Sequence, residues 1–223
     1  LLTPGRLIRT ADGIFIFAWR DKATGYKWDS QTRTLSENCR SDVWTIRSLD
    51  EGATWVDRQR IHKGISGAWP LNIIQTQHGH VVLGVEDFES TRNHGTSFSL
   101  VSKDHGKTWR KSNVIDIGGD GHHDGATEPV IVELNGGRLW MVMRTCLDRF
   151  WQAFSDDGGL TWSHPLLTDI WAPSSPAHLL KLRDGRILCT YGLRRAPMGI
   201  RAVLSQDEGQ TWEVESEIQL SSA

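Results

Sequence analysis

One eight-residue phrase, Ser-x-Asp-x-Gly-x-Thr-Trp, occurs four times in this 223-residue chain. The copies span residues 48–55, 102–109, 155–162 and 205–212, so their starts lie 54, 53 and 50 residues apart. A period near fifty residues indicates stacked or radial modules. The phrase is typical of a tight turn, because Ser, Asp and Thr bond to turn backbone and Gly adopts positive φ. The Trp that ends it supplies a large apolar anchor for the next strand, and we expect all four of these rings to be largely buried.

A second pattern lies upstream of each phrase and consists of a proline, an apolar stretch, a Gly turn and another apolar stretch. The third copy shows it best, with Pro129–Leu134, the turn Asn135–Gly137 and the stretch Arg138–Arg144. Each module therefore predicts four antiparallel strands, A to D, with a Gly hairpin between A and B and the repeated phrase between C and D. This is the sequence pattern of a β-propeller blade. We expect an all-β fold with almost no helix.

The repeats divide the chain into four modules. We expect them at about residues 1–62, 63–117, 118–170 and 171–223, packed as one domain.

Composition excludes several classes of protein. The net charge of −2 has both signs interspersed, so a nucleic-acid surface is not indicated. The chain contains no run of 18 apolar residues, so no membrane span is expected. The first five residues lack the basic and apolar regions of a signal peptide. The three cysteines have no metal-binding spacing and are expected to be buried free thiols, and no metal or other cofactor is expected. The sequence does not indicate an oligomeric state.

Antiparallel strand order separates the loops between two rims. The A–B turns and the repeated phrases share one rim, and the B–C loops, with the starts of A and C, share the other. Arg20, Glu86 and Arg144 each lie seven residues after a turn glycine, at the B–C rim. Arg195 and Arg201 lie near the same rim in the fourth module, and spacing does not choose between them. Converging arginines predict a site for a carboxylate, which their planar forks bind in a bidentate manner.

Other candidate site residues surround the start of the third module. Glu128 precedes strand A there, and the hairpin should bring it beside Arg144 on the B–C rim. The Gly-rich loop 118–127 carries His122, His123 and Asp124, which we expect to line the site as a polar cluster. Trp69 and Trp171 precede strand A in two other modules and could either stack on a ligand ring or simply pack against the protein.

The repeated phrase resembles the Asp box, or BNR repeat, and the whole chain resembles bacterial sialidases and their relatives. The resemblance implies a six-bladed propeller, of which four blades are present here, a glycan substrate, and a secreted or periplasmic location. The segment from Glu128 to Arg144 is similar to the sialidase stretch with a catalytic Glu and a carboxylate-binding Arg. The resemblance also implies an acid/base in the first B–C loop, where Asp29 and Glu37 are the candidates.

Two departures from the sialidase pattern leave two functions open. The nucleophilic Tyr has no clear counterpart, because Tyr26 and Tyr191 stand in other contexts, and Leu2 occupies the region of the first arginine. One hypothesis is a sialidase-like exo-glycosidase that acts on an anionic sugar such as sialic acid. The other is a non-catalytic glycan-binding or structural propeller.

Overall fold

The computed structural model describes residues 4–67, 70–88, 90–172 and 174–222, and the fold is all-β. The first sheet contains β1 (Gly5–Arg9), β2 (Phe15–Arg20), β5 (Val43–Ser48) and β6 (Val56–His62). The second contains β7 (Ile73–Gln75), β8 (Val81–Asp87), β9 (Thr96–Ser102) and β10 (Arg110–Lys111). The third contains β11 (Thr127–Glu133), β12 (Leu139–Arg144), β13 (Arg149–Ser155) and β14 (Leu166–Trp171). The fourth contains β15 (Ala177–Lys181), β16 (Ile187–Leu193), β17 (Gly199–Ser205) and β18 (Ile218–Ser222).

All neighbouring strands in these sheets are antiparallel, which confirms the predicted four-stranded modules. A two-stranded hairpin, β3 (Trp28–Asp29) and β4 (Thr34–Leu35), is inserted between β2 and β5. The helical content of the described residues consists of two 3₁₀ turns, η1 (Asn135–Gly137) and η2 (Val214–Ser216). None of the described helices has the length and hydropathy of a membrane span.

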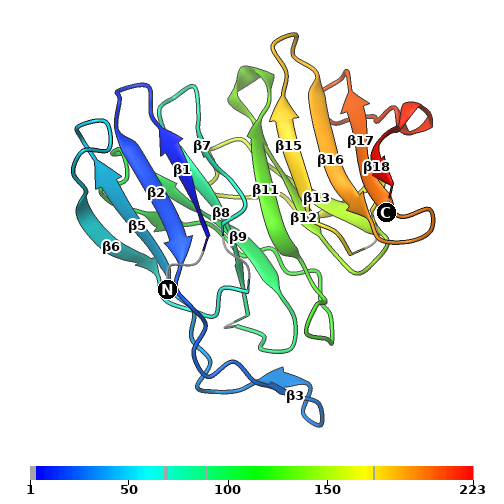
Figure 1. Ribbon diagram of the computed structural model, residues 1–223, viewed down its shortest axis with the longest axis horizontal. Coiled ribbons are helices and arrows are strands. Elements are labelled where there is room, and N and C mark those ends of the chain that lie inside the picture. Colours follow the sequence, from blue (N-terminus) through cyan, green and yellow to red (C-terminus); the bar gives the residue numbers. More distant parts are fainter. Residues whose placement is uncertain (1–3, 68–69, 89, 173, 223) are drawn as a thin grey trace.

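The four sheets stand side by side like blades, with their first strands next to one another (Figure 1). β1 contacts β7, β7 contacts β11, and β11 contacts β15. Apolar clusters fill the spaces between the sheets. The largest lies between the third and fourth sheets and includes Trp140, Phe150 and Ile187. The sheets therefore depend on their neighbours for a core, as repeat modules do.

The four repeated turns have the same hydrogen bonds. In each copy the Thr hydroxyl donates to one carboxylate oxygen of the Asp at 2.6 or 2.7 Å, and the Ser hydroxyl donates to the other at 2.8 or 2.9 Å. The Gly amide donates to the Ser hydroxyl at 2.8 or 2.9 Å. The hydrogen bonds from Thr54 lower the pKa of Asp50 to about 2. These carboxylates are turn-forming groups, as predicted.

Contacts between sheets confirm that the repeated turns and the A–B turns share one rim. Nδ1 of His105, in the second repeated turn, lies 3.1 Å from Oδ2 of Asp12, in the hairpin turn of the first sheet. The carboxylate of Glu208, in the fourth repeated turn, accepts a hydrogen bond from the amide of Asn135, in the hairpin turn of the third sheet. The second and fourth repeated turns thus dock on the hairpin turn of the preceding sheet, and the B–C loops are left for the opposite rim.

The repeated tryptophans do not all become buried, and this part of the prediction was wrong. Trp162 and Trp212 are 5% and 8% exposed, whereas Trp109 is half-buried and Trp55 is 40% exposed. The reason is that each ring packs against the preceding sheet. Trp162 donates to Ser99 of the second sheet at 2.9 Å, and Trp212 stacks on Trp140 of the third. The described residues contain no sheet before the one that carries Trp55.

Replacing the buried ring should therefore cost far more stability than replacing the exposed one. We expect Trp162→Ala to lower the free energy of unfolding by about 3–5 kcal/mol, because it opens a cavity between two sheets and removes the hydrogen bond that Ser99 accepts from the indole. We expect Trp55→Ala to cost less than about 1 kcal/mol. Urea unfolding followed by far-UV circular dichroism measures both. Equal losses would contradict the sheet-to-sheet packing role of these rings.

Candidate active site

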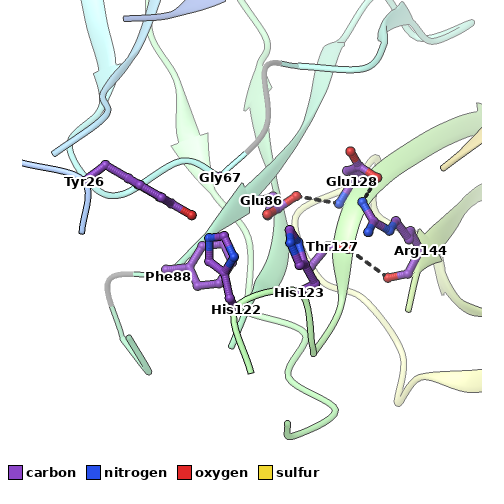
Figure 2. A pocket seen from close by; sticks show the side chains of 9 residues that line it. All are labelled: Tyr26, Gly67, Glu86, Phe88, His122, His123, Thr127, Glu128 and Arg144. Carbon is purple, nitrogen blue, oxygen red and sulfur yellow. Dashed lines mark hydrogen bonds and ion pairs between the residues drawn. The ribbon is translucent and has the colours of Figure 1, made fainter. Parts of the chain in front are cut away.

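A pocket of about 150 Å³ opens on the B–C rim, opposite the repeated turns. Its lining residues come from the first three modules and are Tyr26, Gly67, Glu86, Phe88, His122, His123, Thr127, Glu128 and Arg144 (Figure 2). Glu86 lies near the end of β8, Glu128 near the start of β11 and Arg144 at the end of β12. Strand ends of adjacent sheets therefore build the pocket, as the antiparallel order predicts. A cavity of this volume accepts one ring-sized group.

Glu128 and Arg144 form an ion pair at one side of the pocket, with Arg144 Nη1 2.8 Å from Glu128 Oε2. Both side chains are largely buried, at 20% and 12% exposed. Arg144 Nη2 donates to Ser174 Oγ at 3.0 Å, which holds the second arm of the guanidinium. The prediction that Glu128 and Arg144 face one common pocket is confirmed.

The backbone at Glu128 departs from an ordinary strand. Its φ is +47°, in the left-handed region that residues other than Gly seldom adopt. The β11–β12 register is interrupted between Thr127 and Val130, so a bulge places Glu128 toward the pocket. Such strained conformations persist where the surrounding structure fixes them, and they are concentrated at functional sites.

Glu86 lies at the floor of the pocket and is 6% exposed. Its Oε2 accepts a hydrogen bond from the amide of Glu128 at 2.8 Å, which helps to hold the strained residue. Burial raises the pKa of Glu86 to about 7, although the hydrogen bond from Glu128 acts in the opposite direction. The negative charge of Glu128 adds to the rise, and the positive charges of Arg144 and Arg20 reduce it.

Arg20 approaches this group from β2 but does not line the pocket itself. Its Nη1 donates to Ser66 O at 3.0 Å and to Ser41 Oγ at 3.4 Å. Burial lowers the pKa of Arg20, while the charges of Glu86 and Asp21 raise it. Two positive charges therefore act on Glu86, that of Arg20 from the first sheet and that of Arg144 from the third.

An aromatic wall closes the other side of the pocket. Tyr26, in the loop before β3, directs its ring toward the pocket, and its centroid lies 5.4 Å from that of His122 (Figure 2). Trp28 lies 5.3 Å from His122, and His123 lies 4.3 Å from it. An ion pair between Arg33 and Asp120, 3.2 Å, joins the β3–β4 hairpin to the loop that carries the histidines. Burial lowers the pKa of His122, and the neighbouring His123 adds to this effect.

The sequence predicts His122 and His123 at the site but does not single out Tyr26. Tyr26 lies in the first B–C loop, where the resemblance implies a carboxylate. Because that loop belongs to the B–C rim, its aromatic residue could also have been predicted to line the site. Among the described residues, no group of three or more His, Cys, Asp or Glu side chains is arranged to hold a metal ion.

Three predicted carboxylates do not line the pocket. Asp29 is the last residue of β3, where the turn amides of Thr32 and Gln31 donate to its Oδ1 at 3.0 and 2.8 Å and lower its pKa. Glu37 is exposed beyond β4. Asp124 turns away from the pocket, accepts the amide of Asp120 at 3.2 Å, and lines a separate cavity of about 350 Å³. Short polar side chains in these loops bond to local backbone, which directs them away from the pocket.

The fourth-sheet arginines also lie outside the pocket lining. Arg195 is exposed, pairs with Asp148 at 2.7 Å, and lies 5.8 Å from the centre of the Trp171 ring. Arg201 is buried, and its Nε lies 3.0 Å from the carboxylate of Glu217. The phenol of Tyr191 donates to the same carboxylate. Trp171 thus packs against Arg195. Trp69 and Leu2 lie outside the described residues.

The cysteines differ from one another. Cys39 and Cys189 are buried free thiols, as expected, and burial raises the pKa of both. Cys146 is partly exposed, contrary to the prediction, because it follows β12 in a loop. Its Sγ donates to His123 O at 3.0 Å and lies 3.8 Å from Ser174 Oγ.

Comparison with known proteins identifies the family. Residues 12–222 match the BNR repeat-like domain, so the chain belongs to this family. The fold is similar to that of a protein of unknown function from Dyadobacter fermentans, with 21% identity and a TM-score of 0.70, over 97% of this chain and 64% of that one.

Two other proteins with a similar fold are named as different kinds of glycosidase. A variant of the NanB sialidase from Streptococcus pneumoniae shows 13% identity and a TM-score of 0.67, over 99% of this chain and 49% of that one. An α-L-arabinofuranosidase from Fusarium graminearum shows 14% identity and a TM-score of 0.63, over 98% of this chain and 66% of that one. The chain therefore spans about half to two thirds of the length of the compared proteins. These similarities show the fold alone, because one fold hosts many activities.

The raised pKa of Glu86 has a consequence for stability. Between the ordinary pKa of 4.5 and about 7, the folded state binds more protons at Glu86 than the unfolded state does, so its contribution to stability falls as pH rises. We expect Glu86→Gln to stabilise the protein relative to wild type by roughly 3 kcal/mol more at pH 8 than at pH 4.5. Urea unfolding at the two pH values measures this difference. If the difference in unfolding free energy between Glu86→Gln and wild type is the same at both pH values, the raised pKa of Glu86 is contradicted.

Proposed function

We propose that this protein is a sialidase-like exo-glycosidase that acts on a terminal sugar bearing a carboxylate, such as sialic acid. The observation that supports this most strongly is the Glu128–Arg144 pair at the pocket, beside the buried Glu86. The guanidinium of Arg144 offers a planar fork that stays charged at any working pH, and it can share its donors between Glu128 and a ligand carboxylate. The small volume of the pocket favours one terminal ring over an internal chain segment.

The residues of this chain would perform distinct tasks in such a reaction. Arg144 would bind and orient the sugar carboxylate. Glu128, which pairs with that arginine, would stabilise positive charge at the anomeric carbon or draw a proton from an attacking group. Tyr26 and His122 would cover the bound ring and reduce its contact with water. We further propose that the described sheets are four blades of a six-bladed propeller, that its acid/base and nucleophile include groups beyond these lining residues, and that the protein is secreted or periplasmic.

A non-catalytic glycan-binding function is the second candidate. It is favoured by the placement of the expected catalytic groups, because Asp29 and Glu37 lie outside the pocket lining. Tyr191 is engaged by Glu217 in the fourth sheet, and Tyr26 is the only tyrosine among the described lining residues. A pocket with this arginine pair could bind an anionic sugar without cleaving it.

Hydrolysis of a fluorogenic sialoside by the full-length gene product tests the two candidates. We expect Glu128→Gln to lower kcat/KM at least about 100-fold. Glu51→Gln is the matched control, because Glu51 is exposed on the opposite rim. We expect the 223-residue chain assayed alone to be weakly active or inactive. Binding of sialic acid without hydrolysis by any form would favour the binding module.

The role of Arg144 is tested by its conservative substitution. We expect Arg144→Lys to raise KM, or the Kd of sialic acid, about tenfold or more, because one ammonium cannot replace the two-armed fork. Arg186→Lys is the control, since Arg186 is exposed on the opposite rim and pairs with Asp184. If both substitutions change KM or Kd equally, Arg144 does not bind the carboxylate.

A further inference from the structure

The pocket has a charge balance that a ligand would disturb. Among the described residues, two carboxyl groups, Glu86 and Glu128, face two guanidiniums, Arg20 and Arg144. The other titratable groups among the described lining residues are the imidazoles of His122 and His123 and the phenol of Tyr26. Asp21 also acts on Arg20, but it does not line the pocket, and its carboxylate accepts the amide of Asp42 and the indole of Trp44. With Glu86 and Glu128 ionised and the imidazoles neutral, the charges of Glu86, Glu128, Arg20 and Arg144 cancel.

Burial makes this balance energetically important. Glu86 is 6% exposed, and the side chains of Arg144 and Glu128 are 12% and 20% exposed. An uncompensated charge in such surroundings costs several kcal/mol, because water is not present to solvate it. A ligand carboxylate that enters would be a third negative charge against two positive charges.

We propose that the pocket takes up one proton, held on Glu86, when it binds a carboxylate-bearing ligand. This inference rests on the proposed function and adds a linkage between substrate binding and protonation. Protonation of Glu86 restores the balance, because the ligand and Glu128 then face Arg20 and Arg144. No atom of the sugar changes in this step, and the proton comes from solvent.

The geometry of Glu86 suits a carboxyl group that changes its protonation state. Its Oε2 accepts the amide of Glu128, a bond that both the charged and the neutral carboxyl can accept. Its Oε1 lies against Gly67, where an added Cβ would collide with it, so this oxygen is the one left to carry the proton. The pKa of about 7 in the unliganded pocket means that a nearby negative charge is sufficient to shift the group to its neutral form at neutral pH.

The linkage predicts how affinity depends on pH. Above neutral pH the affinity for a carboxylate ligand should fall by up to tenfold per pH unit, the limit for one linked proton. A neutral sugar of similar shape should show no such dependence. Histidine protonation also adds positive charge, but imidazoles ordinarily titrate near pH 6.5, so measurements between pH 7.5 and 8.5 separate the two effects.

Isothermal titration calorimetry with N-acetylneuraminic acid tests the proposal. At pH 7.5, in Tris and in HEPES, the dependence of the binding enthalpy on buffer ionisation enthalpy gives the number of protons taken up. We expect about three quarters of a proton for the wild-type protein and for Glu51→Gln, because a carboxyl group with a pKa of about 7 is already about one quarter protonated at pH 7.5. We expect none for Glu86→Gln, whose amide mimics the neutral carboxyl and should bind at least as tightly as wild type at pH 8.5.

Each outcome decides between the claims. Binding without proton uptake by the wild-type protein overturns this inference and leaves the proposed function standing. Proton uptake that persists in Glu86→Gln also overturns this inference, because it shows that another group takes up the proton. Absence of binding at every pH overturns the proposed function together with the inference.

Discussion

The hydrogen bonds of the Asp-box turn control the rest of this structure. One carboxylate, such as that of Asp50, accepts the hydroxyls of Ser48 and Thr54, so the turn between the third and fourth strands has one shape in every module. That shape sends the following Trp toward the preceding sheet, as Trp162 shows in its bond to Ser99. Because no single sheet can bury its own faces, this repeated contact sets how the sheets stand beside one another.

Once the repeated turns occupy one rim, the antiparallel order places the strand ends and B–C loops on the other. The pocket is therefore a consequence of strand connectivity, and its chemistry depends on which side chains stand at those ends. Glu128 is the clearest case. The amide of this residue is held by Glu86 and its carboxylate by Arg144, and these two bonds offset the cost of a left-handed backbone in a β-strand.

The sequence was sufficient to predict the strands, the two rims and the pairing of Glu128 with Arg144, because each depends on the repeat period or on a short hairpin. It was not sufficient for residues in long loops. The carboxylate of Asp29 accepts amides of the turn that follows it, and Arg195 forms an ion pair with Asp148 in another loop. Neither contact follows from a periodic sequence pattern. The exposed Trp55 was mispredicted for a related reason, since burial depends on the sheet next to it as well as on its own motif.

The position seven residues after each turn glycine carries Arg20, Glu86 and Arg144 in the first three modules. A third arginine at the central position would place three cations together, with Glu128 as the only carboxylate among the described lining residues. Desolvation would make that arrangement costly in the absence of a ligand. Glutamate at the middle position instead balances the two arginines together with Glu128, and under the proposed linkage it loses its charge when a carboxylate ligand binds. Under this proposal, ionised Glu86 stabilises the pocket before a ligand binds. Protonated Glu86 leaves the pocket with the positive charge that a ligand carboxylate needs.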